Sequence, residues 1–147
     1  MKYKIKKFEE LSTKELYEIL KVRSEVFVVE QNCVYQDIDT KDLASYHLYL
    51  EENNQIIAYS RIIPKGISYN ETSIGRVLTK KSHRKNGLSK EMLKQAIEFI
   101  TKTMNENKIR ISAQAYLIDF YKSLGFEQVS EIYLEDDIEH IEMLYKK

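Results

Sequence analysis

Residues 74–89 read IGRVLTKKSHRKNGLS, and this stretch decides the fold. Apolar residues at its start predict a buried strand over residues 73–79. A basic turn follows and opens the most regular helical pattern of the chain, over residues 88–104. Such a strand–turn–helix edge is a natural anion site, because the first amides of a helix lack internal partners and carry the positive end of its dipole.

The turn has the composition of a phosphate-binding loop. Gly87 removes a side chain where phosphate oxygens would approach the backbone, and Ser89 is small and can donate its hydroxyl. The basic side chains of the turn are Lys80, Lys81, His83, Arg84 and Lys85. From these residues alone, a solvated basic turn explains the pattern equally well. A nucleic-acid contact is a weaker explanation, since no aromatic residues are interleaved here and the rest of the chain is not basic.

Outward from this stretch, periodicity predicts further strands and helices. Ser12 and Glu15 have the form of a capping box, which predicts a helix over residues 13–26. A short helix follows the predicted strand 109–113, and Gly125 can end it in a left-handed conformation. The other expected strands cover residues 3–8, 46–51, 56–63, 126–134 and 140–145.

These elements predict an α/β (α+β) fold with a mixed, mostly antiparallel sheet flanked by helices. The segment from residue 73 to residue 113 is long enough for a crossover, so its two strands should form a central parallel pair. Residues 30–44 fit neither period. A loop of this length in a compact domain is usually functional, so we expect it to wall a substrate site.

Composition narrows the class of protein. The 147 residues suit one domain over 1–147, and 43% of them are hydrophobic. Lys plus Arg and Asp plus Glu both number 23, which gives no general reason to expect nucleic acid or an anionic membrane as partner. Cys33 is the only cysteine, which fits a reducing cytoplasm, and we expect neither a signal peptide nor a membrane span.

Two motifs in the expected order resemble the GNAT family of N-acetyltransferases. Residues 84–89, RKNGLS, resemble its acetyl-coenzyme A motif Gln/Arg-x-x-Gly-x-Gly/Ala, with Ser89 at the final position in place of Gly or Ala. Residues 113–126, AQAYLIDFYKSLGF, resemble its Ala-x-x-x-Tyr-x-x-x-Gly-Phe stretch. Residues 23–39 are similar to the ElaA/YjcF-like subfamily, so the resemblance covers nearly the whole chain.

The resemblance implies a GNAT fold and an acetyl-coenzyme A-dependent transfer of an acetyl group to a primary amine of a small molecule or peptide. It implies that backbone amides hold the coenzyme's pyrophosphate at Arg84, Lys85, Asn86, Gly87, Leu88 and Ser89. It also implies that the strand at Val77, Leu78 and Thr79 pairs with the pantetheine arm, and that Tyr121 is the general acid for the leaving thiolate. A phenol suits that role because it stays protonated at neutral pH.

The sequence leaves the identity of the general base open. His140 resembles the His of a Pro-His-x-x-Met ending in related GNAT proteins, although Glu139 replaces the Pro, and a structural histidine explains it equally well. Glu30, acting through water, is the other candidate. The acceptor site is expected at Glu30, Gln31, Asn32, Tyr35 and Gln114, where Asp37 and Asp39 would attract a cationic amine. Turn and Asx bonding within the loop explains the loop side chains equally well, and Gln114 can also cap the helix that follows it.

Other readings remain open or weaker. A non-catalytic module that binds acyl-coenzyme A is the main alternative, and Tyr121 favours catalysis because binding alone needs no phenol. A Cys33 nucleophile has no basic neighbour in sequence, and no metal-ligand spacing occurs. His47 alternates with apolar residues and is interpreted as structural. A homodimer through the C-terminal strands and simple core burial explain the apolar residues there equally well.

Overall fold

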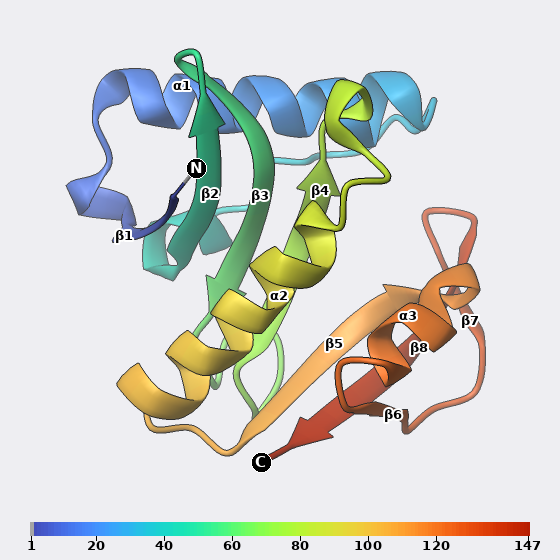
Figure 1. The fold of residues 1–147 in the computed structure, drawn as a ribbon. Coiled ribbons are helices and arrows are strands. Elements are labelled where there is room, and N and C mark those ends of the chain that lie inside the picture. Colours follow the sequence, from blue (N-terminus) through green and yellow to red (C-terminus); the bar gives the residue numbers. More distant parts are fainter. Residues whose placement is uncertain (1) are drawn as a thin grey trace.

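The computed structural model describes residues 2–147 as two neighbouring antiparallel sheets flanked by helices (Figure 1). The strands are β1 (Tyr3–Lys7), β2 (Tyr46–Glu52), β3 (Gln55–Ile63), β4 (Ser73–Thr79), β5 (Lys108–Gln114), β6 (Phe126–Gln128), β7 (Tyr133–Glu135) and β8 (Ile138–Lys146). The α-helices are α1 (Thr13–Arg23), α2 (Leu88–Glu98) and α3 (Ile118–Lys122). Short 3₁₀ turns cover Phe8–Glu10, Lys41–Ala44, Lys81–His83 and Ala115–Leu117, and π-helical turns extend α1 and α2 over Ser24–Glu30 and Phe99–Thr103. The predicted fold class is confirmed.

The predicted parallel pair consists of β4 and β5, and it is very short. Among the described residues, one parallel bridge joins them: it connects Thr72, directly before β4, with Ile109 of β5, and the amide of Arg110 donates to the carbonyl of Thr72 at 2.9 Å. Beyond this bridge they diverge, as Figure 1 shows. The sheet therefore splits into a first part with strand order β1-β2-β3-β4 and a second part with order β5-β8-β6, in which β7 also pairs with β8.

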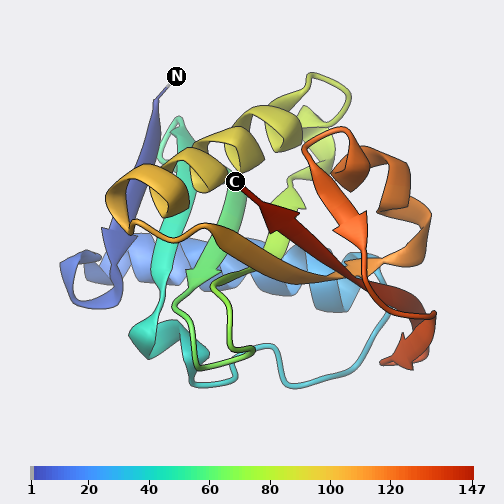
Figure 2. The same cartoon turned by 90° about the horizontal axis from the view of Figure 1, so that it is seen from below.

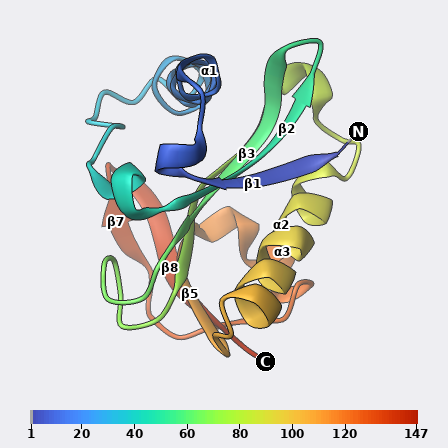
Figure 3. The ribbon, with the colours of Figure 1, turned by 90° about the vertical axis from the view of Figure 1, so that its left-hand side faces the viewer.

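Two helices cover opposite faces of the first sheet (Figure 3). On one face, Ile19, Val22 and Val26 from the first helix and its extension pack against Tyr59 and other buried residues of the sheet. On the other face, the apolar stripe of α2 enters the main core with residues Met92, Leu93, Ala96 and Ile100. The helical periodicity that predicted α2 is therefore the pattern of its burial.

The C-terminal part departs from the predicted strand over residues 126–134. The structure has two short strands there, β6 and β7, which pair with different parts of β8 (Figure 2). Ser130 lies between them, and its hydroxyl accepts a hydrogen bond from the amide of Glu142 at 2.8 Å. A side chain thus takes the place of a backbone partner, which interrupts the ladder at this point.

The first helix starts as predicted and ends later. Ser12 Oγ accepts from the amide of Glu15 at 3.0 Å, and the Glu15 carboxylate accepts from the amide of Ser12 at 2.8 Å, so the capping box is confirmed. The helix does not stop at Val26, because a π-helical turn carries it to Glu30. The irregular segment is consequently shorter than the predicted loop, and the 3₁₀ turn Lys41–Ala44 ends it.

We expect Glu15→Gln to lower the free energy of unfolding by about 1–3 kcal/mol near pH 7, since the carboxylate also accepts from Lys6 and Tyr49. Burial alone would raise the pKa of Glu15, but hydrogen bonds from Ser12, Tyr49 and Lys6 lower it to about 2. This stabilisation is complete above the ordinary pKa near 4.5 and disappears as the pH falls toward 2.

Chemical denaturation at several pH values measures this difference, which should shrink between pH 4.5 and pH 2. Glu25→Gln is the matched control, because this glutamate is exposed. A Glu15→Gln effect that is independent of pH, or no larger than that of the control, would contradict the assignment.

Candidate active site

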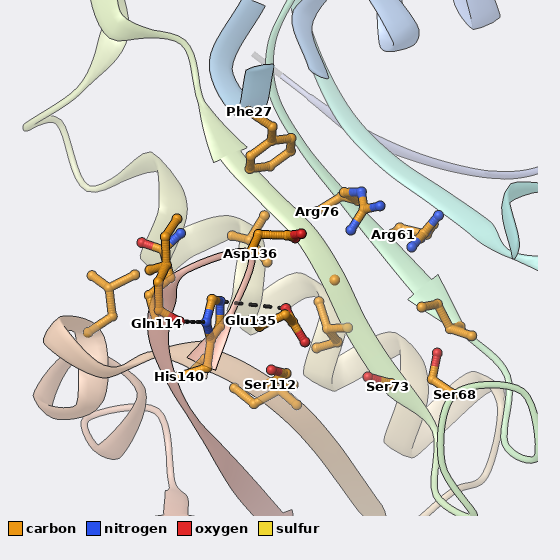
Figure 4. A pocket seen from close by; sticks show the side chains of 18 of the residues that line it. Phe27, Arg61, Ser68, Ser73, Arg76, Ser112, Gln114, Glu135, Asp136 and His140 are labelled. Carbon is orange, nitrogen blue, oxygen red and sulfur yellow. Dashed lines mark hydrogen bonds and ion pairs between the residues drawn. The ribbon is translucent and has the colours of Figure 1, made fainter. Parts of the chain in front are cut away.

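A cavity of about 360 Å³ lies where β4 and β5 diverge (Figure 4). Its walls come from these strands, from the segment after α1 and from the turn before β8. The predicted site residues that line it are Gln31, Tyr35, Val77, Gln114, Tyr121 and His140. Those that do not line it are Glu30, Asn32, Leu78, Thr79 and residues 84–89. The structure thus brings the candidate acid, one candidate base and part of the acceptor set into one space.

Tyr121 faces this cavity from α3. Its side chain is buried and makes edge-to-face contacts with the rings of Phe120 and Phe126, at centroid distances of 5.2 and 5.8 Å. Burial, with a smaller contribution from Tyr116, raises the pKa of Tyr121 to about 12. The phenol therefore remains a proton donor over the whole physiological range.

His140 lies on β8 directly opposite Gln114 on β5. Its Nδ1 is 2.7 Å from the carbonyl oxygen of Ile138. A carbonyl only accepts, so Nδ1 carries the hydrogen and the neutral ring has its lone pair on Nε2. That nitrogen lies 3.6 Å from the carboxylate of Glu135, which would stabilise a protonated ring. The Tyr133 ring is stacked with the imidazole, with the two ring centroids 6.2 Å apart.

The turn after β4 leads directly into the N-terminus of α2. Gly87 precedes the helix with φ of +73°, and a side chain at this position would meet no other atom of the chain within 4 Å. Within residues 2–147, the amides of Lys85, Asn86 and Gly87 have no hydrogen-bond partner. The first amides of α2 are free in the same way. An anion at this turn would therefore meet several unused donors.

Side chains fix the shape of this turn. Arg84 donates from Nε to the carbonyl of Thr79 at 2.9 Å, and its guanidinium binds both carboxylate oxygens of Glu30. That hydrogen bond with Arg84 lowers the pKa of Glu30. The hydroxyls of Thr79 and Ser89 lie 2.6 Å apart, so the serine that departs from the family motif ties α2 to the end of β4.

Beside the cavity, six charged side chains form a closed ring of alternating sign. In order they are Arg23, Asp37, Arg76, Asp39, Arg61 and Asp42, with nitrogen–oxygen distances from 2.6 to 3.4 Å. Burial disfavours the ionised carboxylates, but hydrogen bonds from the arginines lower the pKa of Asp39 and Asp42. The ring joins the end of α1, the irregular segment, β3 and β4 into one wall.

The ring occupies the aspartates of the irregular segment that the sequence suggested as acceptor-binding residues. From sequence, Asp37 and Asp39 were expected to attract a cationic amine, whereas both carboxylates are bound by arginines of this chain. The arginines themselves were missed. The available signal was a charge at an apolar position, because Arg23 lies on the core stripe of α1 and Arg61 lies within a buried strand.

Other expectations concern single residues. His47 is fully buried, with Nδ1 2.7 Å from the Tyr59 hydroxyl and Nε2 3.0 Å from the Asp42 carbonyl, so it is structural as predicted.

Residues 2–147 contain no cluster of three or more His, Cys, Asp or Glu side chains able to hold a metal ion. Over the same residues, none of the helices combines the length and the apolar character that a membrane crossing requires.

Comparison with known proteins agrees with this geometry. Residues 9–147 match the family model of the acetyltransferase (GNAT) domain. ElaA of Escherichia coli is 39% identical over 136 residues, which is 91% of this chain and 89% of ElaA. A UPF0039 protein of Schizosaccharomyces pombe is 39% identical over 145 residues, which is 97% of this chain and 95% of that protein.

Solved structures extend the likeness to three dimensions. The crystal structure of E. coli ElaA superposes with a TM-score of 0.92 at 36% identity and covers 99% of this chain and 100% of ElaA. An acyl-CoA N-acyltransferase from Pseudomonas aeruginosa superposes with a TM-score of 0.93 at 37% identity, over 99% of both chains. The chain therefore belongs to the GNAT acetyltransferase family, whose fold supports acyl-coenzyme A-dependent acyl transfer.

Proposed function

We propose that this protein transfers an acetyl group from acetyl-coenzyme A to a primary amine of a small molecule or peptide. One arrangement carries the proposal: β4 lines the cavity and leads directly into a turn of unused amides at the N-terminus of α2. The Pseudomonas aeruginosa relative is described as an acyl-CoA N-acyltransferase, which supports the same class of donor and the same acceptor atom.

The coenzyme would lie along the turn and along β4. Its pyrophosphate would accept hydrogen bonds from the amides of residues 84–89, with the positive end of the α2 dipole beneath it. One edge of β4 pairs with β3, while the other meets β5 only at the Thr72–Ile109 bridge among the described residues. The backbone of Val77, Leu78 and Thr79 therefore has an open edge on which an extended pantetheine arm can pair.

The amine must lose a proton in order to attack. His140 lines the cavity and its Nε2 has an available lone pair, whereas Glu30 lies outside the cavity and its carboxylate is bound by Arg84. We therefore assign the base to His140, with Glu135 as the counter-ion of the imidazolium that forms. Gln31, Tyr35 and Gln114 would contact the acceptor from the cavity wall, and Asn32 and Glu30 would act from beside it.

The reaction also requires groups that stabilise the negative charge on the thioester carbonyl oxygen and protonate the leaving sulfur. A bulge in the β3–β4 register turns Arg76 to φ of +51°, and the amides beside it would stabilise the developing oxyanion. As the carbon–sulfur bond breaks, Tyr121 would donate its proton to the thiolate. Its raised pKa keeps the phenol protonated, and the retained proton is the reason that Tyr121 supports catalysis rather than binding alone.

Replacing Gly87 by Ala should weaken acetyl-coenzyme A binding by about tenfold or more, equivalent to about 1.4 kcal/mol. The added methyl disfavours φ of +73°, and it would lie where we propose that phosphate oxygens approach the backbone. Calorimetry with the coenzyme measures this loss. Gly66→Ala is the matched control, since Gly66 also has a positive φ, +84°, and open space around it but lies outside the turn. Equal affinity of both variants and the wild type would count against the proposed pyrophosphate site.

Tyr121→Phe should lower kcat by about 10²–10⁴-fold, the usual contribution of a general acid, and should change coenzyme affinity little. The phenylalanine keeps the ring contacts and removes only the proton donor. Thiol release gives kcat, and calorimetry gives the affinity. Tyr17→Phe is the control, because this tyrosine is 66% exposed on α1 and does not line the cavity. Wild-type turnover in Tyr121→Phe would exclude Tyr121 as the acid.

His140→Gln should lower kcat/KM at pH 7 by about 10²-fold or more. The loss of kcat/KM relative to the wild type should shrink as the pH rises, because a free amine with a pKa of about 10 then loses its proton in solution. The complete pH profile of thiol release is the measurement, since a purely structural role would lower activity equally at every pH. Parallel profiles for the variant and the wild type would remove His140 as the base.

A further inference from the structure

The cavity has two ends of opposite character. At one end lie Glu135, the last residue of β7, and Asp136, in the turn before β8, next to His140. Glu135 has His140 as its ion-pair partner at 3.6 Å, and Asp136 has no ion-pair partner within residues 2–147. An ammonium group approaching the proposed base would therefore meet two carboxylates. Figure 4 shows this acidic end beside Gln114.

The other end presents nitrogen and hydroxyl donors. The Lys41 side chain lines the cavity and donates from Nζ to the hydroxyl of Ser68 at 3.0 Å. Its backbone amide donates to Asp39, but within the described chain its ammonium group has no carboxylate partner. Ser73 adds a second hydroxyl to the lining. Figure 4 shows Ser68 and Ser73 on the same side of the cavity as Arg61 and Arg76, across from His140.

The arginines of the ring present hydrogen-bond donors at this end, and the aspartates of the ring are neutralised by them. Three arginines and three aspartates cancel in charge, so Asp39 is neutralised although it lines the cavity. Arg76 uses Nε and Nη2 in the ring, and its Nη1 has no hydrogen-bond partner within residues 2–147. Arg61 is 2% exposed, and its Nε is buried without a partner. Because the positive charge of Lys41 is not neutralised by a carboxylate of the chain, this end of the cavity favours binding of an anion.

We propose that the acceptor is an amine that also bears a carboxylate, as an amino acid does. Its amine would lie between Glu135, Asp136 and His140, and its carboxylate would bind Lys41 and Arg76. This inference rests on the proposed function and narrows its acceptor class. The volume of about 360 Å³ lies at the small end of ligand pockets, which favours a small molecule over a folded protein surface.

Charge-assisted hydrogen bonds give this arrangement its selectivity. A carboxylate that binds Lys41 and the free Nη1 of Arg76 satisfies donors that an unsubstituted amine would leave unpaired in a partly closed space. We expect the carboxylate to raise kcat/KM by about 10-fold to 100-fold, which is the usual size of a hydrogen bond to a charged group. The gain should appear mainly as a lower KM.

The test compares amino acids with their decarboxylated amines, which differ only by the carboxylate. Thiol release from acetyl-coenzyme A is measured for the pairs lysine and cadaverine, ornithine and putrescine, and phenylalanine and phenethylamine. We expect the amino acid to be the better acceptor by about tenfold or more in at least one pair. An equal or faster rate for the plain amine in every pair would overturn the inference.

Lys41→Gln then tests whether the end of the cavity that contains Lys41 binds the carboxylate of the acceptor. It should raise the KM of the preferred amino acid by about tenfold or more and leave the KM of the matching amine unchanged. Lys65→Gln is the control, since Lys65 is exposed and pairs with Glu106 away from the cavity. A Lys41→Gln effect of the same size on both members of a pair would also overturn the inference.

The two proposals fail in different ways. Absence of acetyl-coenzyme A binding in calorimetry would remove the proposed function and this inference with it. Binding accompanied by turnover of plain amines alone would leave the proposed function intact and contradict the carboxylate. Binding without thiol release from any of these amino acids would contradict the acceptor class and leave the coenzyme site standing.

Discussion

One short contact between β4 and β5 organises the whole molecule. The strands are parallel neighbours, yet within residues 2–147 the only bridge between them is that of Thr72 with Ile109. If they paired over their full length, β4 would have no free edge and the cavity would be closed. Because they diverge, the chain has a space between two sheets, an unpaired backbone edge on one side of it, and β8 with His140 on the other. The proposed donor and acceptor sites both depend on this divergence.

The ring of arginines and aspartates holds the remaining wall in place. It connects segments that are far apart in sequence, and it does so at sites that are largely desolvated. Such pairs add little net stability, because the cost of removing the charges from water nearly cancels their attraction, whereas breaking one pair leaves a buried charge. The ring therefore acts as a constraint on geometry. It fixes the irregular segment against β4 and orients Arg76 at the cavity.

Sequence periodicity predicted most elements, since apolar residues at the period of a helix or strand report burial directly. The helix α2, the capping box of α1 and the strands β2 and β3 follow from local chemistry alone. The division of residues 126–134 depends on a hydrogen bond of Ser130 with a distant strand, which no local pattern encodes. The ring was missed for the same reason: Asp37 and Asp39 have partners 14 to 39 positions away. Motif resemblance located Tyr121, His140 and the turn, but the opposite charge of the two cavity ends appears only in three dimensions.

The most direct measurement of the central claim is a crystal structure of the protein with acetyl-coenzyme A. The account predicts the pyrophosphate on the amides of residues 84–89, the pantetheine arm along Val77–Thr79, and the thioester sulfur within hydrogen-bonding reach of the Tyr121 hydroxyl. A coenzyme bound elsewhere with this turn empty, or a thioester directed away from Tyr121 and the cavity, would contradict it.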